Sequence, residues 1–258
     1  MKRYARTLLP AIQRAVLIFS QLRFSQLSRG ALTAVLLSAS LLLSGCASNS
    51  ERPFRITDLA KTDIDTVTDT HIREVKSLAE ELMIKLYRRN PRELAKAVPK
   101  TTLKQRVQQL FGSPRALGFT ELQGKDGVKA IPLAFDPAFS GDRVFALMAG
   151  ISGMLHASYN YQNEFFILDE LSHQKLYNSA RNLEAIAWQL NNRRDSHGEL
   201  FILSNGATPN GIRNLSYERQ FGKIIALQDM MATLIANSTN RTITKVIHSV
   251  ASTTLLPI

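Results

Sequence analysis

The stretch DRVFALMAGISGMLHASY, residues 142–159, is apolar on nearly every side. Its large apolar side chains recur at three- and four-residue steps, which predicts a helix. Ala146, Gly150 and Gly153 would let a neighbouring segment approach this helix closely. The apolar run is shorter than the roughly 20 residues needed to cross a bilayer, and an arginine and a histidine bound it. We therefore expect a buried central helix, and the alternative is a transmembrane span.

Amphipathic helices are expected on both sides of this central helix, because apolar residues recur there at helical spacing between polar ends. Thr102 and Gln105 fit a capping box, in which each side chain accepts a hydrogen bond from the other residue's backbone N–H. Two weaker segments, Ala130–Phe135 and Phe201–Leu203, are expected to form short strands. The expected helices are Thr68–Asn90, Arg92–Val98, Thr102–Gly112, Asp169–Asn192, Ser216–Ala236 and a last one from Thr239 or Asn240 to Val250.

These elements predict an all-α or α-dominated fold, a multi-helix globular domain of roughly seven helices with one or two short strands. Residues 58–258 are expected to form this single domain, since 45% of the chain is hydrophobic, as in ordinary globular proteins. The helix at 169–192 has the clearest apolar seam. Asn178, Arg181 and Asn182 are expected on its other side, away from the core.

A second apolar run, ALTAVLLSASLLL at residues 31–43, follows a basic segment and ends in small residues. Its 13 residues match the core of a secretory signal and are too few to span a bilayer. The run closes in LSGC, residues 43–46, which resembles the lipobox of bacterial lipoproteins. This resemblance implies that signal peptidase II removes residues 1–45 and that diacylglycerol is attached to Cys46. The segment before the run is long, which fits either an extended signal or translation from near Leu27.

Cys46 is the only cysteine in the chain, so no disulfide can form within one chain although the expected compartment is oxidising. In enterobacteria-like sorting, an Asp directly after the acylated cysteine retains a lipoprotein in the inner membrane, and Ala47 stands there instead. The resemblance therefore implies the periplasmic face of the outer membrane if the organism is Gram-negative. The inner membrane or a Gram-positive surface is the alternative. Residues 46–57 are polar and contain proline, as expected of a lipidated tether.

The basic excess of the chain has two parts. Six of the 32 Lys and Arg and none of the 21 Asp and Glu lie before residue 47, which leaves 26 against 21, a net charge of +5. The segment from residue 73 to residue 115 contains 11 basic and 4 acidic residues. This cluster would suit anionic head groups beside the anchor, at about 1 kcal/mol per well-placed cation, or an acidic protein or polymer. A solvated basic face is the simpler alternative, and nucleic acid is not expected in this compartment. The candidate residues for an anionic surface are Arg88, Arg89, Arg92, Lys96, Lys100 and Lys104, with Arg106 in the same cluster.

Two short patterns bear on catalysis. SHQK, residues 172–175, matches the S-x-x-K pattern of penicillin-binding proteins and β-lactamases, in which the lysine lies one turn from the serine. That family also needs a Lys-Thr-Gly-like strand, and the chain contains neither KTG nor KSG. Glu170 and His173 make a single Glu-x-x-His step, whereas a di-iron helix bundle requires two. We therefore expect no metal and no cofactor other than the covalent lipid on Cys46.

A polar ligand site built from His173, Arg181 and His197 is a further possibility. The last of these lies in the polar loop 191–198, which also fits an ordinary helix end followed by a glycine turn. The sequence favours an outer-membrane-anchored periplasmic lipoprotein with a non-enzymatic role in envelope organisation or complex assembly, through binding another envelope protein or an anionic envelope component. The alternative is a periplasmic enzyme, a hydrolase, with a non-local active site around these three residues.

Overall fold

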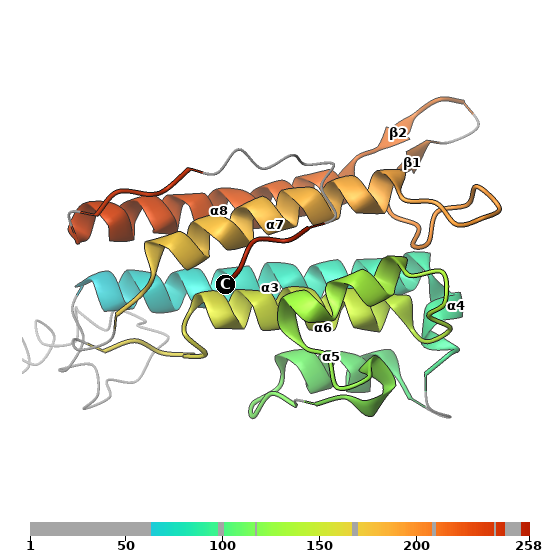
Figure 1. Cartoon of the computed structure of the whole chain (residues 1–258), viewed down its shortest axis with the longest axis horizontal. Helices are drawn as coiled ribbons and strands as arrows, with labels where there is room; N and C mark the ends of the chain where they lie inside the picture. The colour runs from blue at the N-terminus through green and yellow to red at the C-terminus, as the bar shows by residue number, and fades with distance from the viewer. Residues whose placement is uncertain are drawn as a thin grey trace, which may run out of the picture. The chain divides into compact units, whose positions relative to one another are not determined.

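Helices make up nearly all of the regular secondary structure of the described residues, as predicted, and these residues also form a small antiparallel hairpin (Figure 1). The lipobox at 43–46 with Cys46, the tether at 46–57 and Lys100 lie outside the residues that the structure describes. The computed structural model describes residues 63–97, 101–116, 118–166, 170–207, 210–239, 241–245 and 254–258. The elements are α3 (Asp63–Arg89), α4 (Pro91–Leu94), α5 (Leu103–Phe111), η2 (Thr120–Leu122), η3 (Gly127–Lys129), η4 (Ile131–Phe135), α6 (Arg143–Ser158), α7 (His173–Asn192), β1 (Gly206–Ala207), β2 (Arg213–Asn214) and α8 (Ser216–Ser238).

Helix α6 is the buried centre of the fold, as its apolar character predicts. Every residue from 144 to 155 is buried. The Asp142 carboxylate caps the start of the helix by accepting a hydrogen bond of 2.9 Å from the backbone N–H of Phe145. Among the described residues, no helix combines the length and the apolar character needed to cross a membrane.

The small residues of α6 allow the close approach that the sequence predicts. A Cβ atom on Gly153 would lie 2.8 Å from the backbone nitrogen of Gly127 in η3, and one on Gly150 would clash with the side chain of Ile131 in η4. Because both glycines lack a side chain, these two 3-10 helices pack directly on the α6 backbone.

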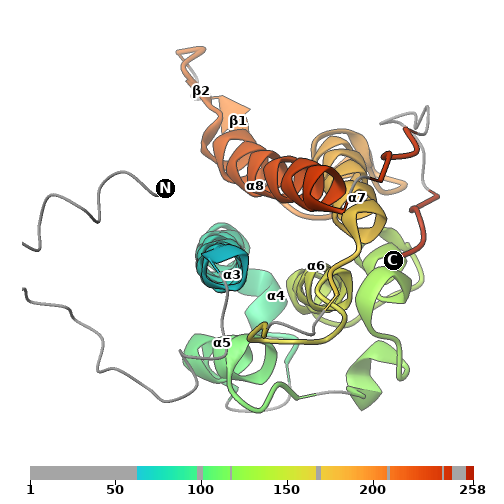
Figure 2. The same cartoon turned by 90° about the vertical axis from the view of Figure 1, so that its left-hand side faces the viewer.

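The other helices surround α6 in layers (Figure 2). Helix α3 lies alongside α6, and α5 packs against both of them on one side. Helices α7 and α8 pack along each other and cover the opposite side, where α8 contacts α3 and α7 contacts α6. The apolar faces of all five meet in one continuous core.

Two predicted strands are wrong. Residues Ile131–Phe135 form η4, because Pro132 removes a backbone donor that a strand ladder would need and sets the backbone for a helical turn. Residues 201–203 are irregular, and the strands lie further along as the pair β1–β2, with Gly206 opposite Asn214. Turn chemistry places the hairpin there, since asparagine and glycine residues separate the two strands.

Several helix ends differ from the prediction, and α7 begins at His173, four residues after the expected Asp169. Helix α3 begins five residues before Thr68, since Asp63 and Asp65 in its first turn suit the positive end of the helix dipole. Helix α4 ends at Leu94 and continues only as a turn. Residues 241–245 are irregular, so the predicted last helix does not begin at its expected cap, and its remaining residues lie outside the described ranges. The capping box of α5 is confirmed in full.

Candidate functional site

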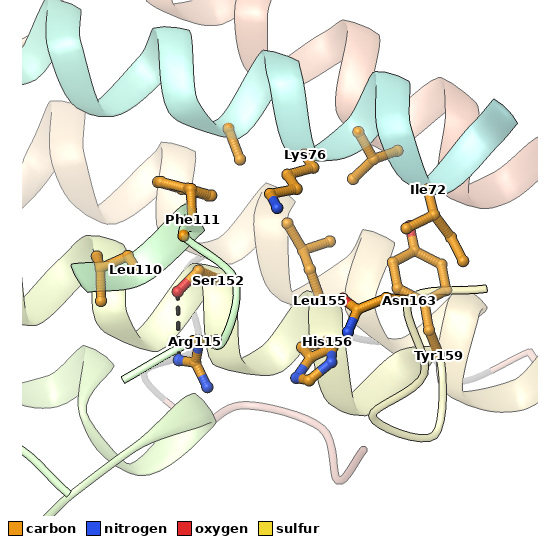
Figure 3. A pocket seen from close by; sticks show the side chains of 13 residues that line it. Ile72, Lys76, Leu110, Phe111, Arg115, Ser152, Leu155, His156, Tyr159 and Asn163 are labelled. Carbon is orange, nitrogen blue, oxygen red and sulfur yellow. Dashed lines mark hydrogen bonds between the residues drawn. The ribbon is translucent and has the colours of Figure 1, made fainter. Parts of the chain in front are cut away.

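A groove opens between α3, the end of α5 and α6 (Figure 3). It holds a cavity of about 60 Å³. Apolar side chains make up most of its lining, Lys76 extends into it from α3, and Arg115, Ser152 and His156 lie along its α6 side. The lining residues are Ile72, Val75, Lys76, Ala79, Leu110, Phe111, Gly112, Arg115, Ser152, Leu155, His156, Tyr159 and Asn163.

Two cations border the groove, and they differ in how firmly they are held. Arg115 donates two hydrogen bonds to the Asp126 carboxylate, at 2.9 and 3.1 Å, and one to the Ser152 hydroxyl at 3.3 Å. Lys76 is exposed, and its ammonium group extends into the groove without an ion-pair partner among the described residues (Figure 3). Lys76 is therefore the charge that an incoming group can use.

His156 lies beside these cations on α6. Burial lowers the pKa of its imidazole, and the positive charge of Arg115 lowers that pKa further. Both ring nitrogens are closed to solvent. A backbone hydrogen bond with Tyr161 opposes the lowering of the pKa, and the Tyr161 ring packs edge-on at 5.5 Å between ring centroids.

The size of the groove limits what it can hold. One water molecule needs about 10–15 Å³ of cavity volume. The cavity of about 60 Å³ therefore holds only a few water molecules or one short apolar group. A whole acyl chain does not fit. The arrangement instead suits one apolar side chain, or the end of a longer apolar group, next to an anionic group at Lys76.

A second, polar cavity of about 440 Å³ lies between α4, the start of α6 and the loop after α7. It brings together three residues from separate parts of the sequence prediction: Arg92 and Lys96 of the basic cluster and His197 of the polar loop. Arg143 joins them. No sequence pattern groups Arg143 with the others, because it is 51 residues after Arg92 (143 − 92) and lies outside the basic cluster at 73–115.

The cations of this polar cavity are already engaged. The buried Glu93 carboxylate lies 2.9 Å from Lys96 Nζ and 3.4 Å from Arg92 Nε, and it accepts a hydrogen bond of 2.9 Å from the backbone N–H of Arg143. The Arg143 guanidinium donates to three backbone carbonyls, and burial lowers its pKa. Asp195 adds a second negative charge. The cavity is therefore nearly balanced in charge, and the groove is the better candidate for binding.

The remaining described members of the predicted basic cluster are three exposed residues and one buried residue. Arg88 and Arg89 are exposed at the end of α3, and Lys104 is exposed on α5. Arg106 is only 1% exposed and pairs with the Glu121 carboxylate at 2.6 Å, so it belongs to the core and not to a basic surface. Its position gives a signal, since it follows the apolar Leu103 by three residues on the side of α5 that packs inward.

His173, Arg181 and His197 are not brought together. His173 begins α7 and His197 follows its end, so a 20-residue helix of about 30 Å separates them. Arg181 pairs with the carboxylates of Asp229 at 2.6 Å and Glu184 at 3.1 Å. These three residues therefore do not form one active site, and the hydrolase hypothesis that depends on them is not supported.

The S-x-x-K pattern is a helix cap. The Ser172 hydroxyl accepts a hydrogen bond of 3.4 Å from the backbone N–H of Lys175. The ammonium group of Lys175 turns to the Asn160 side chain at 3.1 Å. Among the described residues, no group of three or more His, Cys, Asp and Glu side chains could hold a metal ion.

The sequence prediction missed the groove residues Lys76, Arg115 and His156. Lys76 directly follows Val75 at the edge of the apolar stripe of α3, which is a weak signal. The other two come from separate segments that only the fold joins. No protein-family model matches this chain, and no curated protein and no solved structure matches it.

Proposed function

We propose that this protein is an outer-membrane lipoprotein, held at the periplasmic face by lipid on Cys46, with a non-enzymatic role in envelope organisation or complex assembly. The LSGC sequence at 43–46 and the lone cysteine support the anchor. Two or more acyl chains are needed for stable anchoring, and a lipoprotein cysteine carries them.

The observation that carries a binding role is the free ammonium group of Lys76 beside the apolar lining of the groove. Such a site holds an envelope component in which an apolar group lies next to a negative charge. An acidic protein segment and an anionic head group both have this chemistry, and they are distinguished by test.

The anchor is tested by replacing Cys46 with Ala in the full-length chain. We expect labelling with radioactive palmitate to disappear and the unprocessed precursor to accumulate. Normal labelling and cleavage of this variant would refute the lipoprotein assignment.

The groove is tested by charge reversal at Lys76. We expect Lys76→Glu to abolish the pull-down of a partner, or the flotation of the protein with anionic vesicles, whichever the wild-type protein shows. Lys223→Glu is the matched control, because Lys223 is an exposed lysine on α8, outside the groove. Equal loss in both variants would show a nonspecific charge effect and would count against the groove.

One observation favours a hydrolase as the second candidate. Ser152 and His156 lie one helical turn apart in the groove lining. The Ser152 hydroxyl, however, donates to the Ala149 carbonyl at 3.3 Å and accepts from Arg115, so the histidine does not activate it. We expect Ser152→Ala to leave partner binding unchanged. Hydrolysis of an ester or amide substrate that disappears in Ser152→Ala would favour the enzyme instead.

A further inference from the structure

The last described residues of the chain, 254–258, lie against α7 and are called here the C-terminal segment. The Asn182 side chain pairs with both backbone groups of Leu256: its amide donates to the Leu256 carbonyl at 2.9 Å and its oxygen accepts from the Leu256 N–H at 2.6 Å. One turn earlier, the Asn178 amide donates to the Pro257 carbonyl at 2.8 Å. The side chains of both asparagines therefore form hydrogen bonds with the backbone of the C-terminal segment and not with its side chains.

A third amide continues this pattern. The Gln174 side chain pairs with both backbone groups of Thr244, at 3.0 and 3.1 Å. Gln174, Asn178 and Asn182 are spaced by four residues and share one side of α7, called here the amide face. A side-chain amide has an oxygen acceptor and two N–H donors, and one of these N–H groups lies beside the oxygen. The N–H and C=O of a single residue in an extended strand also lie side by side, so each of these amides can pair with one such residue as a strand neighbour would.

Details of the pairing show that the amide face fits main chain closely. Pro257 has no N–H, and the Asn178 oxygen that would accept it receives a hydrogen bond of 2.9 Å from Gln174 instead. Asn182 is 0% exposed. A buried asparagine is tolerated only when its polar atoms are paired, and the backbone of Leu256 supplies the partners.

The side chains of the C-terminal segment contribute less. Leu255, Leu256 and Ile258 are only half-buried. Beyond Leu255, toward the end of α7, a cavity of about 310 Å³ is lined by Gln189, Arg193 and residues of η4. The hollow beside α7 therefore extends further than the C-terminal segment fills it.

We propose that the amide face of α7 is a binding surface for an extended peptide, occupied here by the protein's own C-terminal segment at Asn178 and Asn182 and by Thr244 at Gln174. An extended, uncharged, apolar segment of a partner protein replaces the C-terminal segment, because the amides bind backbone groups and the half-buried side chains tolerate other apolar residues. This inference rests on the proposed role in complex assembly and names the kind of partner. Its own evidence, the pairing of the amide face with main chain, comes from residues outside the groove.

The test uses a fluorescent peptide with the sequence STTLLPI, residues 252–258, and a chain that ends at residue 253. We expect the truncated chain to bind the peptide. The intact chain should bind at least tenfold more weakly, because its own segment competes at a millimolar effective concentration. Circular dichroism checks that the truncated chain is folded.

Two changes distinguish specific binding of the peptide backbone from nonspecific apolar binding. N-methylation of Leu256 in the peptide removes the N–H that Asn182 accepts, and Asn182→Ala in the truncated chain removes both hydrogen bonds. Each should weaken binding at least tenfold. Asn192→Ala is the control and should have no effect, since the Asn192 amide bonds only the Trp188 carbonyl of its own helix.

Failure of the folded truncated chain to bind, or equal binding of the N-methylated peptide, would overturn the proposal. A concentration-dependent dimer of the intact chain that disappears on truncation would identify a second copy as the occupant and would overturn the partner segment. Normal lipid labelling of the Cys46→Ala variant, or equal loss of binding in the Lys76→Glu and Lys223→Glu variants, would instead count against only the proposed function, so the two failures are distinguishable.

Discussion

His71 of α3 gives a sharp prediction about acid stability. Its Nε2 atom lies 3.1 Å from the Tyr159 hydroxyl and 3.3 Å from the Gln228 side-chain oxygen, in a buried junction of α3, α6 and α8. Burial lowers the pKa of His71 from 6.5 to about 4, although the hydrogen bond with Gln228 opposes the shift. The folded protein therefore keeps the ring neutral at a pH where the unfolded chain is already protonated.

The sign and size of the effect follow from proton linkage. The stability that a lowered histidine pKa contributes is complete above pH 6.5 and is lost as the pH falls toward 4. Between pH 7.5 and 4.5 the loss amounts to about 2.5 kcal/mol of the free energy of unfolding. Urea unfolding followed by circular dichroism at both values measures it.

The comparison uses His71→Gln, which keeps a hydrogen-bond donor and cannot titrate. We expect wild type to lose about 2.5 kcal/mol more than this variant between the two pH values. His197→Gln, at an exposed histidine, should behave as wild type. If wild type and His71→Gln lose the same free energy, the ring is not held neutral and the reasoning fails.

The buried Asp142 also titrates in this pH range, so wild type must be compared with His71→Gln to isolate the effect of His71. Burial raises the pKa of Asp142 to about 6, against the hydrogen bonds from Tyr87 and from the backbone of Phe145. A raised carboxyl pKa favours the folded state as the pH falls through 6, which is opposite in sign to the effect of His71. Between pH 7.5 and 4.5 the destabilisation from His71 exceeds the stabilisation from Asp142 by less than about 1 kcal/mol. These two groups would therefore change the free energy of unfolding of wild type only slightly.

Three further changes test the buried interior by urea unfolding. Asp142→Asn removes the opposing carboxyl group, so this variant should lose about 2 kcal/mol more than wild type between pH 7.5 and 4.5; an unchanged pH dependence would contradict the raised pKa. Arg106→Met leaves Asp142 and Glu121 without their buried counter-charge and should cost about 3–5 kcal/mol at pH 7.5, and a cost below 1 kcal/mol would show that the pair is dispensable. Gly153→Ala places a Cβ atom 2.8 Å from the Gly127 nitrogen and should cost about 1–3 kcal/mol, whereas Gly222→Ala on α8 meets nothing within 4 Å and should not destabilise; equal values would mean that η3 can move away.

The helices could be predicted because their causes are local in sequence. The apolar run of α6, the capping box of Thr102 and Gln105 and the seam of α7 each lie within a few turns of chain. The segment 130–135 was misassigned because a short apolar run is compatible with a strand as well as with a buried 3-10 helix. Pro132 disfavours the strand, and the packing of Ile131 on Gly150 adds a long-range contribution that the local sequence does not show.

The candidate sites were less predictable because they join distant segments. The groove combines Lys76 of α3 with Arg115 and His156, and the polar cavity combines Arg92 with Arg143 and His197. Charge clustering along the sequence grouped Arg106 with Arg92, yet the fold buries Arg106 and leaves Arg92 exposed. Proximity in sequence was therefore a poor guide to which charges share a surface.

The amide face of α7 shows the physical limit most clearly. Helical spacing placed Asn178 and Asn182 away from the apolar seam, as polar residues that need no partner from the core. Both are buried, because backbone groups of the C-terminal segment, 74 residues further on for Asn182, satisfy their amides. A pattern of side chains cannot indicate that a residue will bind main chain, because nearly every residue has the same backbone N–H and C=O groups. For the same reason, a surface that binds main chain can accept segments of different sequence, which is why we expect the amide face to bind a partner's segment as well as the protein's own.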